Sequence, residues 1–150
     1  MNKGITKILL LGILALSAMS CSDGGEKNEV DESLEAFYKS KLIGHWVPFE
    51  VQFGEDAPII PFSEAEHIVF RNEPERSSFT FKEGGFMLYD GDKEGNWTLI
   101  EWNKDYARIK TKEWIETRFY DCSFEENYNV LILKFQSYTI KPEMRKYRRT

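Results

Sequence analysis

After residue 44, apolar and polar side chains alternate with a period of two along most of this chain. Between Val47 and Phe53, the apolar residues alternate with Pro48, Glu50 and Gln52. Period two is the repeat of a β-strand that buries one face. The same repeat returns in short segments separated by polar or glycine-containing breaks. It predicts further strands over residues 67–71, 78–82, 86–90, 96–102, 106–111, 114–124, 129–135 and 138–149.

The predicted strands follow one another at short spacing, and no helix long enough to connect parallel strands lies between them. They should therefore pair as an antiparallel meander, with a hairpin at Glu83-Gly84-Gly85. A meander of this length usually closes on itself, because closure removes exposed sheet edges. The expected fold class is all-β, an antiparallel up-and-down β-barrel or a tightly rolled half-barrel.

A different period precedes the strands. From Ser33 to Lys41 the side chains of Leu34, Phe37 and Tyr38 fall on one side of a helix, and Ser33 is a good N-cap residue. We expect one or two helical turns here, ended by Gly44. The barrel domain is therefore expected to span residues 33–150.

The first residues have the three parts of an export signal. Lys3 and Lys7 supply positive charge, residues 8–16 supply an apolar segment, and residues 18–20 supply small or slim side chains just before Cys21. The uncharged run is too short to span a bilayer comfortably, since a spanning helix needs about 20 apolar residues. We therefore expect residues 1–20 to be a signal peptide that is removed.

The sequence Ala18-Met19-Ser20-Cys21 resembles the lipobox of bacterial lipoproteins. The resemblance implies that Cys21 is acylated and that the lipid attaches the protein to a membrane. Residues 21–32 are rich in acidic residues, glycine and serine, so we expect them to form a flexible acidic tether. The leader also resembles those of Bacteroidetes lipoproteins. Ser22 after the cysteine favours the outer membrane, so the expected location is the cell envelope, on either the periplasmic or the surface face.

The segment Leu42-Ile43-Gly44-His45-Trp46, at the start of the first strand, is similar to the Gly-x-Trp signature of lipocalins. The similarity covers most of residues 33–150 and is greatest to lipocalin-like lipoproteins of Bacteroidetes, with a later Gly95-Asn96-Trp97-Thr98 strand start. It implies that Trp46 closes one end of the barrel and that an arginine of the last strand packs over it. The spacing leaves three arginines open for that role: Arg145, Arg148 and Arg149.

All aromatic residues lie after Cys21, and they supply both core material and candidate ligand contacts. Phe79 and Phe81 share one strand face, whereas Trp97 and Trp102 fall on opposite faces of another strand. These four residues are the candidate ligand-binding residues. A small barrel can be filled by its own side chains or can keep a usable cavity, and both alternatives stay open at this stage.

The remaining chemistry is sparse. Asp90 to Glu101 nearly matches a calcium loop, but strands flank it where helices are needed, so we interpret it as an acidic hairpin. His45 and His67 have no metal-ligand spacing. Cys122, the only thiol left after lipidation, has the alternation of a buried strand residue. We therefore expect no metal, no cofactor and no enzymatic activity.

Charge excludes one further class of protein. The net charge of −5 is concentrated in the acidic segment after Cys21, and the barrel region is nearly neutral. Nucleic-acid binding needs a basic surface, so it is not expected. The leading functional hypothesis is a membrane-tethered, non-enzymatic binding module for a small apolar or amphipathic molecule. The alternative is an accessory lipoprotein whose barrel surface docks onto another cell-envelope protein.

Overall fold

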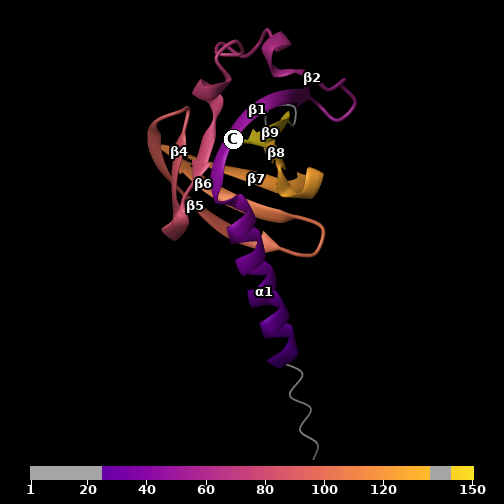
Figure 1. Ribbon diagram of the computed structural model, residues 1–150, viewed down its shortest axis with the longest axis vertical. Helices are drawn as coiled ribbons and strands as arrows, with labels where there is room; N and C mark the ends of the chain where they lie inside the picture. The colour runs from indigo at the N-terminus through magenta and orange to yellow at the C-terminus, as the bar shows by residue number, and fades with distance from the viewer. Residues whose placement is uncertain (1–24, 136–142) are drawn as a thin grey trace, which may run out of the picture.

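The computed structural model describes residues 25–135 and 143–150, and it shows an antiparallel β-barrel with a helix at one end (Figure 1). Cys21 and the signal segment lie outside the described residues. The helix, α1, spans Gly25–Leu42. The strands are β1 Gly44–Phe53, β2 Ile60–Pro61, β3 Phe79–Phe81, β4 Phe86–Tyr89, β5 Lys93–Trp102, β6 Ala107–Glu113, β7 Glu116–Glu125, β8 Val130–Phe135 and β9 Glu143–Arg149.

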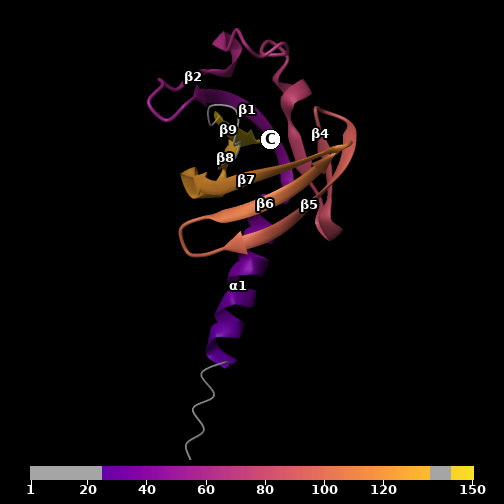
Figure 2. The ribbon, with the colours of Figure 1, turned by 180° about the vertical axis from the view of Figure 1, so that it is seen from behind.

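The barrel is closed, which decides between the two architectures expected from the sequence. β1 pairs antiparallel with β3, and each strand from β3 to β8 pairs antiparallel with the next along the chain. β1 then pairs with β9 from Trp46 opposite Arg149 to Phe53 opposite Glu143. The result is an eight-stranded closed barrel, an all-β meander as predicted. Seen from behind, β5, β6 and β7 form one wall of it (Figure 2).

One predicted strand is wrong. Residues 67–71 form turns instead of a strand, within a connection between β1 and β3 that contains only the two-residue β2 and two 3-10 helices, Phe62–Glu64 and Pro74–Ser77. Pro61 and Pro74 lie on either side of these residues and limit how far a strand through them could extend, because proline donates no backbone hydrogen bond. Phe62 and Ala65 instead pack with Val51 in a small separate cluster. The connection therefore covers the part of β1 beyond the short β3.

The helix is longer than the sequence pattern predicted. It begins at Gly25, within the segment expected to be an extended tether, instead of near Ser33. Residues 26–42 contain neither glycine nor proline, and glutamates in the first turn favour helix formation. Its last turns cover one end of the barrel, where Tyr38 and Leu42 are buried. Among the described helices, none is long and apolar enough to cross a membrane.

The core fills the half of the barrel next to α1. Buried residues of every barrel strand form one contiguous cluster with the helix. Its largest completely buried side chains include Trp46, Phe81, Met87, Ile109, Leu131 and Tyr147. At about 25 cal/mol per Å² of apolar surface buried, side chains of this size dominate the stability of the fold. This packed half of the barrel closes off the inner end of the open half.

Candidate functional site

The end of the barrel next to α1 is plugged by Trp46. The indole N–H donates to the Leu42 carbonyl oxygen at 2.7 Å, and the ring is completely buried. Of the three arginines left open by the sequence, Arg149 lies over the ring, with its guanidinium carbon 4.5 Å from the ring centroid. Arg149 also donates to the Lys41 carbonyl oxygen at 2.5 Å, which ties β9 to the end of α1. Gly44 has a φ of +143°, a conformation that glycine adopts readily.

The opposite half of the barrel contains a cavity of about 500 Å³. It opens among the β4–β5 turn, the β6–β7 turn and the ends of β7, β8 and β9. Its apolar lining comprises Phe79, Tyr120, Leu133, Phe135 and Tyr147. Its polar lining comprises Ser77, Asp90, Glu113, Glu116, Thr117, Arg118, Glu143 and Arg145. The barrel is therefore filled at one end and hollow at the other.

Four aromatic rings form a continuous wall of this cavity. Phe79 lies 5.7 Å from Tyr147 and 5.9 Å from Tyr120, measured between ring centroids. Tyr120 in turn lies 5.7 Å from Phe135. Such tilted and edge-to-face pairs stabilise one another, so the wall is fixed before any ligand binds. An apolar ligand group would find this surface ready formed.

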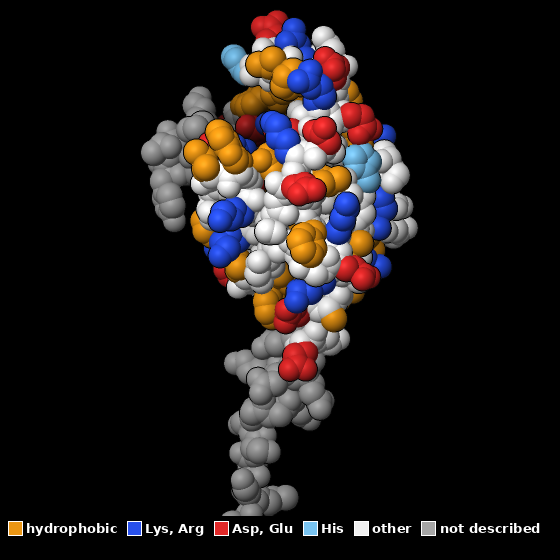
Figure 3. All heavy atoms as spheres, turned by 90° about the vertical axis from the view of Figure 1, so that its left-hand side faces the viewer, with side chains coloured by type: hydrophobic (Ala, Val, Ile, Leu, Met, Phe, Trp, Pro, Cys, Tyr) orange, Lys and Arg blue, Asp and Glu red, His pale blue; other side chains and the backbone are white. Residues whose placement is uncertain are grey.

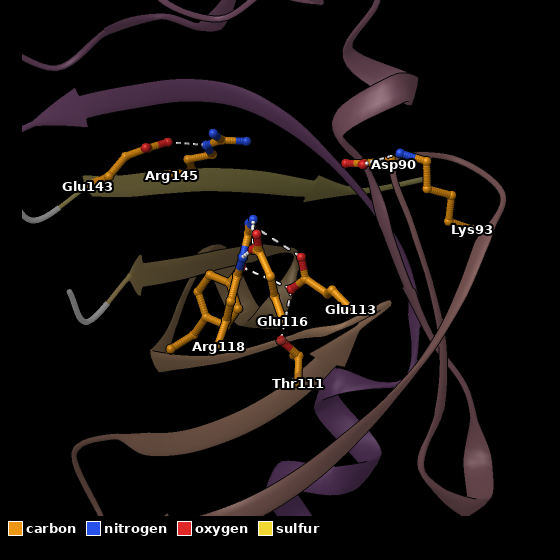
Figure 4. A network of polar contacts seen from close by, with 9 residues as sticks. Asp90, Lys93, Thr111, Glu113, Glu116, Arg118, Glu143 and Arg145 are labelled. Carbon is orange, nitrogen blue, oxygen red and sulfur yellow. Dashed lines mark hydrogen bonds and ion pairs between the residues drawn. The ribbon is translucent and has the colours of Figure 1, made fainter. Parts of the chain in front are cut away.

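A buried carboxylate lies beside the rings. Glu113 is 7% exposed and comes from the inward face of β6. One of its oxygens accepts hydrogen bonds from the hydroxyls of Thr111 at 2.8 Å and Tyr120 at 3.1 Å. Its other oxygen lies 3.3 Å from the Arg118 guanidinium. Figure 4 shows Glu113, Glu116 and Arg118 pointing toward one another. The buried charge is thus fully partnered, as a buried carboxylate must be.

Two arginines carry positive charge into the cavity. Burial opposes the charge on Arg118, but a hydrogen bond to Glu116 and the charge of Glu113 outweigh it and raise its pKa above the ordinary value. Burial likewise opposes the charge on Arg145, and the nearby Tyr147 and Glu143 outweigh it, so the pKa of Arg145 is also raised. Both guanidinium groups are therefore charged throughout the physiological range.

The two cavity tyrosines keep their protons. Burial, followed by the charge of Glu113, raises the pKa of Tyr120 well above its ordinary value. Burial raises the pKa of Tyr147 to about 12, although the neighbouring Arg145 acts in the opposite direction. Each hydroxyl therefore remains a hydrogen-bond donor at neutral pH.

The structure brings one of the four predicted ligand residues to the cavity. Phe79 lines it, and Phe81 stacks on Phe79 with centroids 5.6 Å apart but belongs to the filled core. Trp97 is buried and donates to the Lys82 carbonyl oxygen at 3.0 Å, and it lines a second, more open pocket of about 530 Å³ beside α1. Trp102 is half-buried and packs against the core.

Sequence reasoning missed the charged residues of the cavity. The sequence pattern assigns no cavity role to Glu113 or Arg118, and it names Arg145 only as one of three arginines that could pack over Trp46, because a charged residue on a strand is usually solvent-facing. The sequence did contain one signal, the strand face on which the two arginines fall. Arg118 and Arg145 each stand two residues before a tyrosine, Tyr120 and Tyr147, so each pair shares one strand face.

The other candidate residues make contacts that stabilise turns or the core. Asp90 makes an ion pair with Lys93 at 2.9 Å in the β4–β5 turn, and Glu101 accepts a hydrogen bond from the Tyr106 hydroxyl. No group of three or more potential metal-binding side chains occurs among the described residues. Cys122 is buried on the inward face of β7, and burial raises its thiol pKa.

The two histidines join the β1–β3 connection to β1, His45 from the strand and His67 from the connection. His45 Nδ1 lies 2.7 Å from the Thr80 hydroxyl oxygen, and Nε2 lies 2.8 Å from a Glu75 carboxylate oxygen. His67 packs edge-on against Phe53 at 5.8 Å between ring centroids. His45 therefore fastens the second 3-10 helix of the connection to the outside of the barrel.

Comparison with known proteins adds no relative to this picture. No family model matches the chain, and neither the curated proteins nor the solved structures include a significant match. The class of protein is accordingly defined by its architecture, a closed eight-stranded antiparallel barrel with one plugged end and one hollow end.

Proposed function

We propose that this protein binds a small amphipathic molecule in the hollow half of its barrel. The observation that carries this proposal is the cavity of about 500 Å³ between β6, β7 and β9. Sites for small molecules occupy roughly 300–1,000 Å³ and combine an apolar lining with a few placed polar groups. The aromatic wall and the neighbouring charged residues supply both parts.

The distribution of the lining favours an amphipathic ligand over a purely apolar one. Phe79, Tyr120, Phe135 and Tyr147 offer an apolar surface. Glu113, Arg118, Glu143 and Arg145 lie within the same cavity, so a wholly apolar molecule would separate these charges from water without replacing their hydrogen bonds. A molecule with one polar end matches both surfaces.

The proposed setting is the cell envelope. The sequence Ala18-Met19-Ser20-Cys21 supports acylation of Cys21, and acyl chains that each bury many methylenes hold a protein on a bilayer. The resemblance of residues 42–46 to the lipocalin signature supports a role in binding and not in catalysis. We therefore propose an outer-membrane-anchored, non-enzymatic binding module of lipocalin-like type.

One observation favours a second candidate function, docking onto another envelope protein. Trp114 and Ile115, the tip of the β6–β7 turn, are 79% and 76% exposed. Apolar tips of this kind are common at protein interfaces. Figure 3 shows one face of the molecule, on which exposed apolar side chains are interspersed with charges of both signs.

Binding of a fluorescent apolar probe tests the first candidate. We expect N-phenyl-1-naphthylamine to bind with a rise in fluorescence, and Phe135→Ala to weaken that binding several-fold because it removes part of the aromatic wall. Phe119→Ala is the matched control, since Phe119 lies on β7 with 39% exposure and does not line the cavity. Equal loss in both variants, or no binding by the parent protein, contradicts the proposal.

A further inference from the structure

We propose that the ligand of the cavity is an amphipathic carboxylic acid whose carboxylate binds Arg145. This inference rests on the proposed function and adds the chemical class of the ligand. It follows from which hydrogen-bonding groups of the cavity already have partners and which still offer donors.

Arg145 is the principal source of free donors. Its Nε donates to a Glu143 oxygen, and the Tyr147 hydroxyl is a second partner. A guanidinium carries several further N–H groups, and within residues 32–135 and 143–150 no other side chain hydrogen-bonds them. The side chain is 27% exposed, so these donors face the cavity instead of open water.

The acceptors of the cavity, in contrast, are largely occupied. Both Glu113 oxygens have partners, one bonded to Thr111 and Tyr120 and the other paired with Arg118. One oxygen of Glu143 is bonded to Arg145. The N–H groups of Arg145 that no described side chain accepts from are therefore donors in the cavity, and a ligand group that accepts hydrogen bonds complements them.

The guanidinium of Arg145 is held in place from two sides. Its charged carbon lies 5.7 Å from the centroid of the Phe62 ring, which belongs to the connection between β1 and β3. The residue itself sits within β9, where it pairs with Val51 of β1 and Leu133 of β8. A preorganised guanidinium loses little side-chain entropy when it binds a planar carboxylate through two parallel hydrogen bonds.

The other charges on the cavity wall are balanced locally. Asp90 pairs with Lys93, and Glu113 pairs with the charged Arg118. Glu116, at 60% exposure, accepts hydrogen bonds from Nε and Nη2 of Arg118 at 3.0 and 2.6 Å, so it shares that guanidinium with Glu113. Glu143 is the one carboxylate that competes directly with a ligand for Arg145 (Figure 4). The proposal therefore predicts opposite effects of removing Arg145 and of removing the charge of Glu143.

Matched probes with one alkyl chain and three different head groups provide the test. Octanoate, octylamine and 1-octanol are titrated calorimetrically into residues 21–150 carrying Cys21→Ala. This chain keeps every described element and has no acyl group to compete for the cavity. We expect octanoate to bind most tightly. Arg145→Gln should weaken octanoate about tenfold to a hundredfold, the effect of losing charge-assisted hydrogen bonds.

Two further variants separate the charge effect from a structural one. Glu143→Gln keeps an acceptor for Arg145 Nε and removes the competing charge, so it should strengthen octanoate binding and weaken octylamine binding. Arg148→Gln removes the same charge from the exposed side of β9 and should leave all three titrations unchanged. Unchanged 1-octanol binding to Arg145→Gln shows that the cavity is intact in that variant.

The outcomes distinguish the two proposals. Tighter binding of octylamine or 1-octanol than of octanoate overturns the carboxylate assignment and leaves the binding function standing. An equal loss of all three probes in Arg145→Gln also overturns it, because Arg145 is then a structural residue. Failure of every probe to bind the parent chain overturns the binding function and the carboxylate assignment together.

Discussion

Trp46 combines complete burial with a satisfied indole N–H and a cation over its ring. Large aromatic side chains bury much apolar surface, and the polar edge of a buried tryptophan needs an acceptor, which Leu42 supplies. Arg149 adds the cation, worth about 0.5–2 kcal/mol in such an arrangement. Trp46 therefore stabilises the plugged end of the barrel, and it lies away from the cavity.

Truncation of this residue gives a direct measure of that role. We expect Trp46→Ala to lower the free energy of unfolding by about 3–5 kcal/mol, as large aromatic deletions in cores do. Trp114→Ala is the control, because Trp114 is 79% exposed and surface changes usually fall within about 0.5 kcal/mol. Chemical denaturation of both variants measures the difference. A loss below about 1 kcal/mol for Trp46→Ala would show that the ring contributes little to the fold.

Ionisation of Tyr147 should lower the free energy of unfolding at alkaline pH. Its pKa is about 12 in the folded barrel and about 10 in an unfolded chain, so the folded state retains the proton more tightly. This contribution is fully present below pH 10 and is lost as the pH rises toward 12. Between pH 9 and 11 the loss from this one group is about 1 kcal/mol. Denaturation midpoints should fall less over this interval in Tyr147→Phe than in the parent protein, and equal falls would contradict the assignment.

At the scale of the elements, periodicity identified the strands whose faces differ in polarity. β5 and β6 lie where the alternation predicted them, β8 lies at the continuous apolar run that begins at Val130, and the hairpin at Glu83-Gly84-Gly85 joins β3 to β4. The failures have physical causes. The segment His67 to Arg71 contains apolar residues, but its neighbouring prolines and its packing through Phe62 favour turns. Apolar content alone therefore did not define a strand there.

The helix and the cavity were harder to predict from sequence. The start of α1 lies in a segment whose composition indicated an extended tether. Helix propensity is a weak signal in a sequence, because most of the stability of a helix comes from tertiary contacts. The cavity depends on charged residues from β6, β7 and β9 that meet only when the sheet closes. Their meeting is a property of strand register, which one strand's sequence does not contain.

At the scale of the whole molecule, α1 and the hollow end lie at opposite ends of the barrel. α1, which leads back toward Cys21, covers the plugged end, and the cavity opens among turns on the far side of the core (Figure 1). A barrel attached through the N-terminal side of α1 would therefore open its cavity at the end far from that helix.

The anchor itself is testable. Cys21→Ala should abolish acylation and release the protein from the membrane fraction, because the acyl chains proposed on Cys21 are what hold the protein on the bilayer. Metabolic labelling with a fatty-acid analogue and fractionation of cells measure the two effects. Ser22→Ala serves as the control and should remain labelled and membrane-bound. Equal recovery of Cys21→Ala and the parent protein in the membrane fraction would overturn the anchor.

The pairing of β1 with β9 also affects how the protein is made. The barrel seam joins the earliest and the latest strands of the meander, and Trp46 is covered only when Arg149 is in place. Contacts between residues so distant in sequence form slowly, since a long loop must close first. Until β9 has been synthesised, β1 and β8 present unpaired edges on which nascent chains can aggregate. The yield of folded protein should therefore rise when chaperones that hold unfolded chains are co-produced.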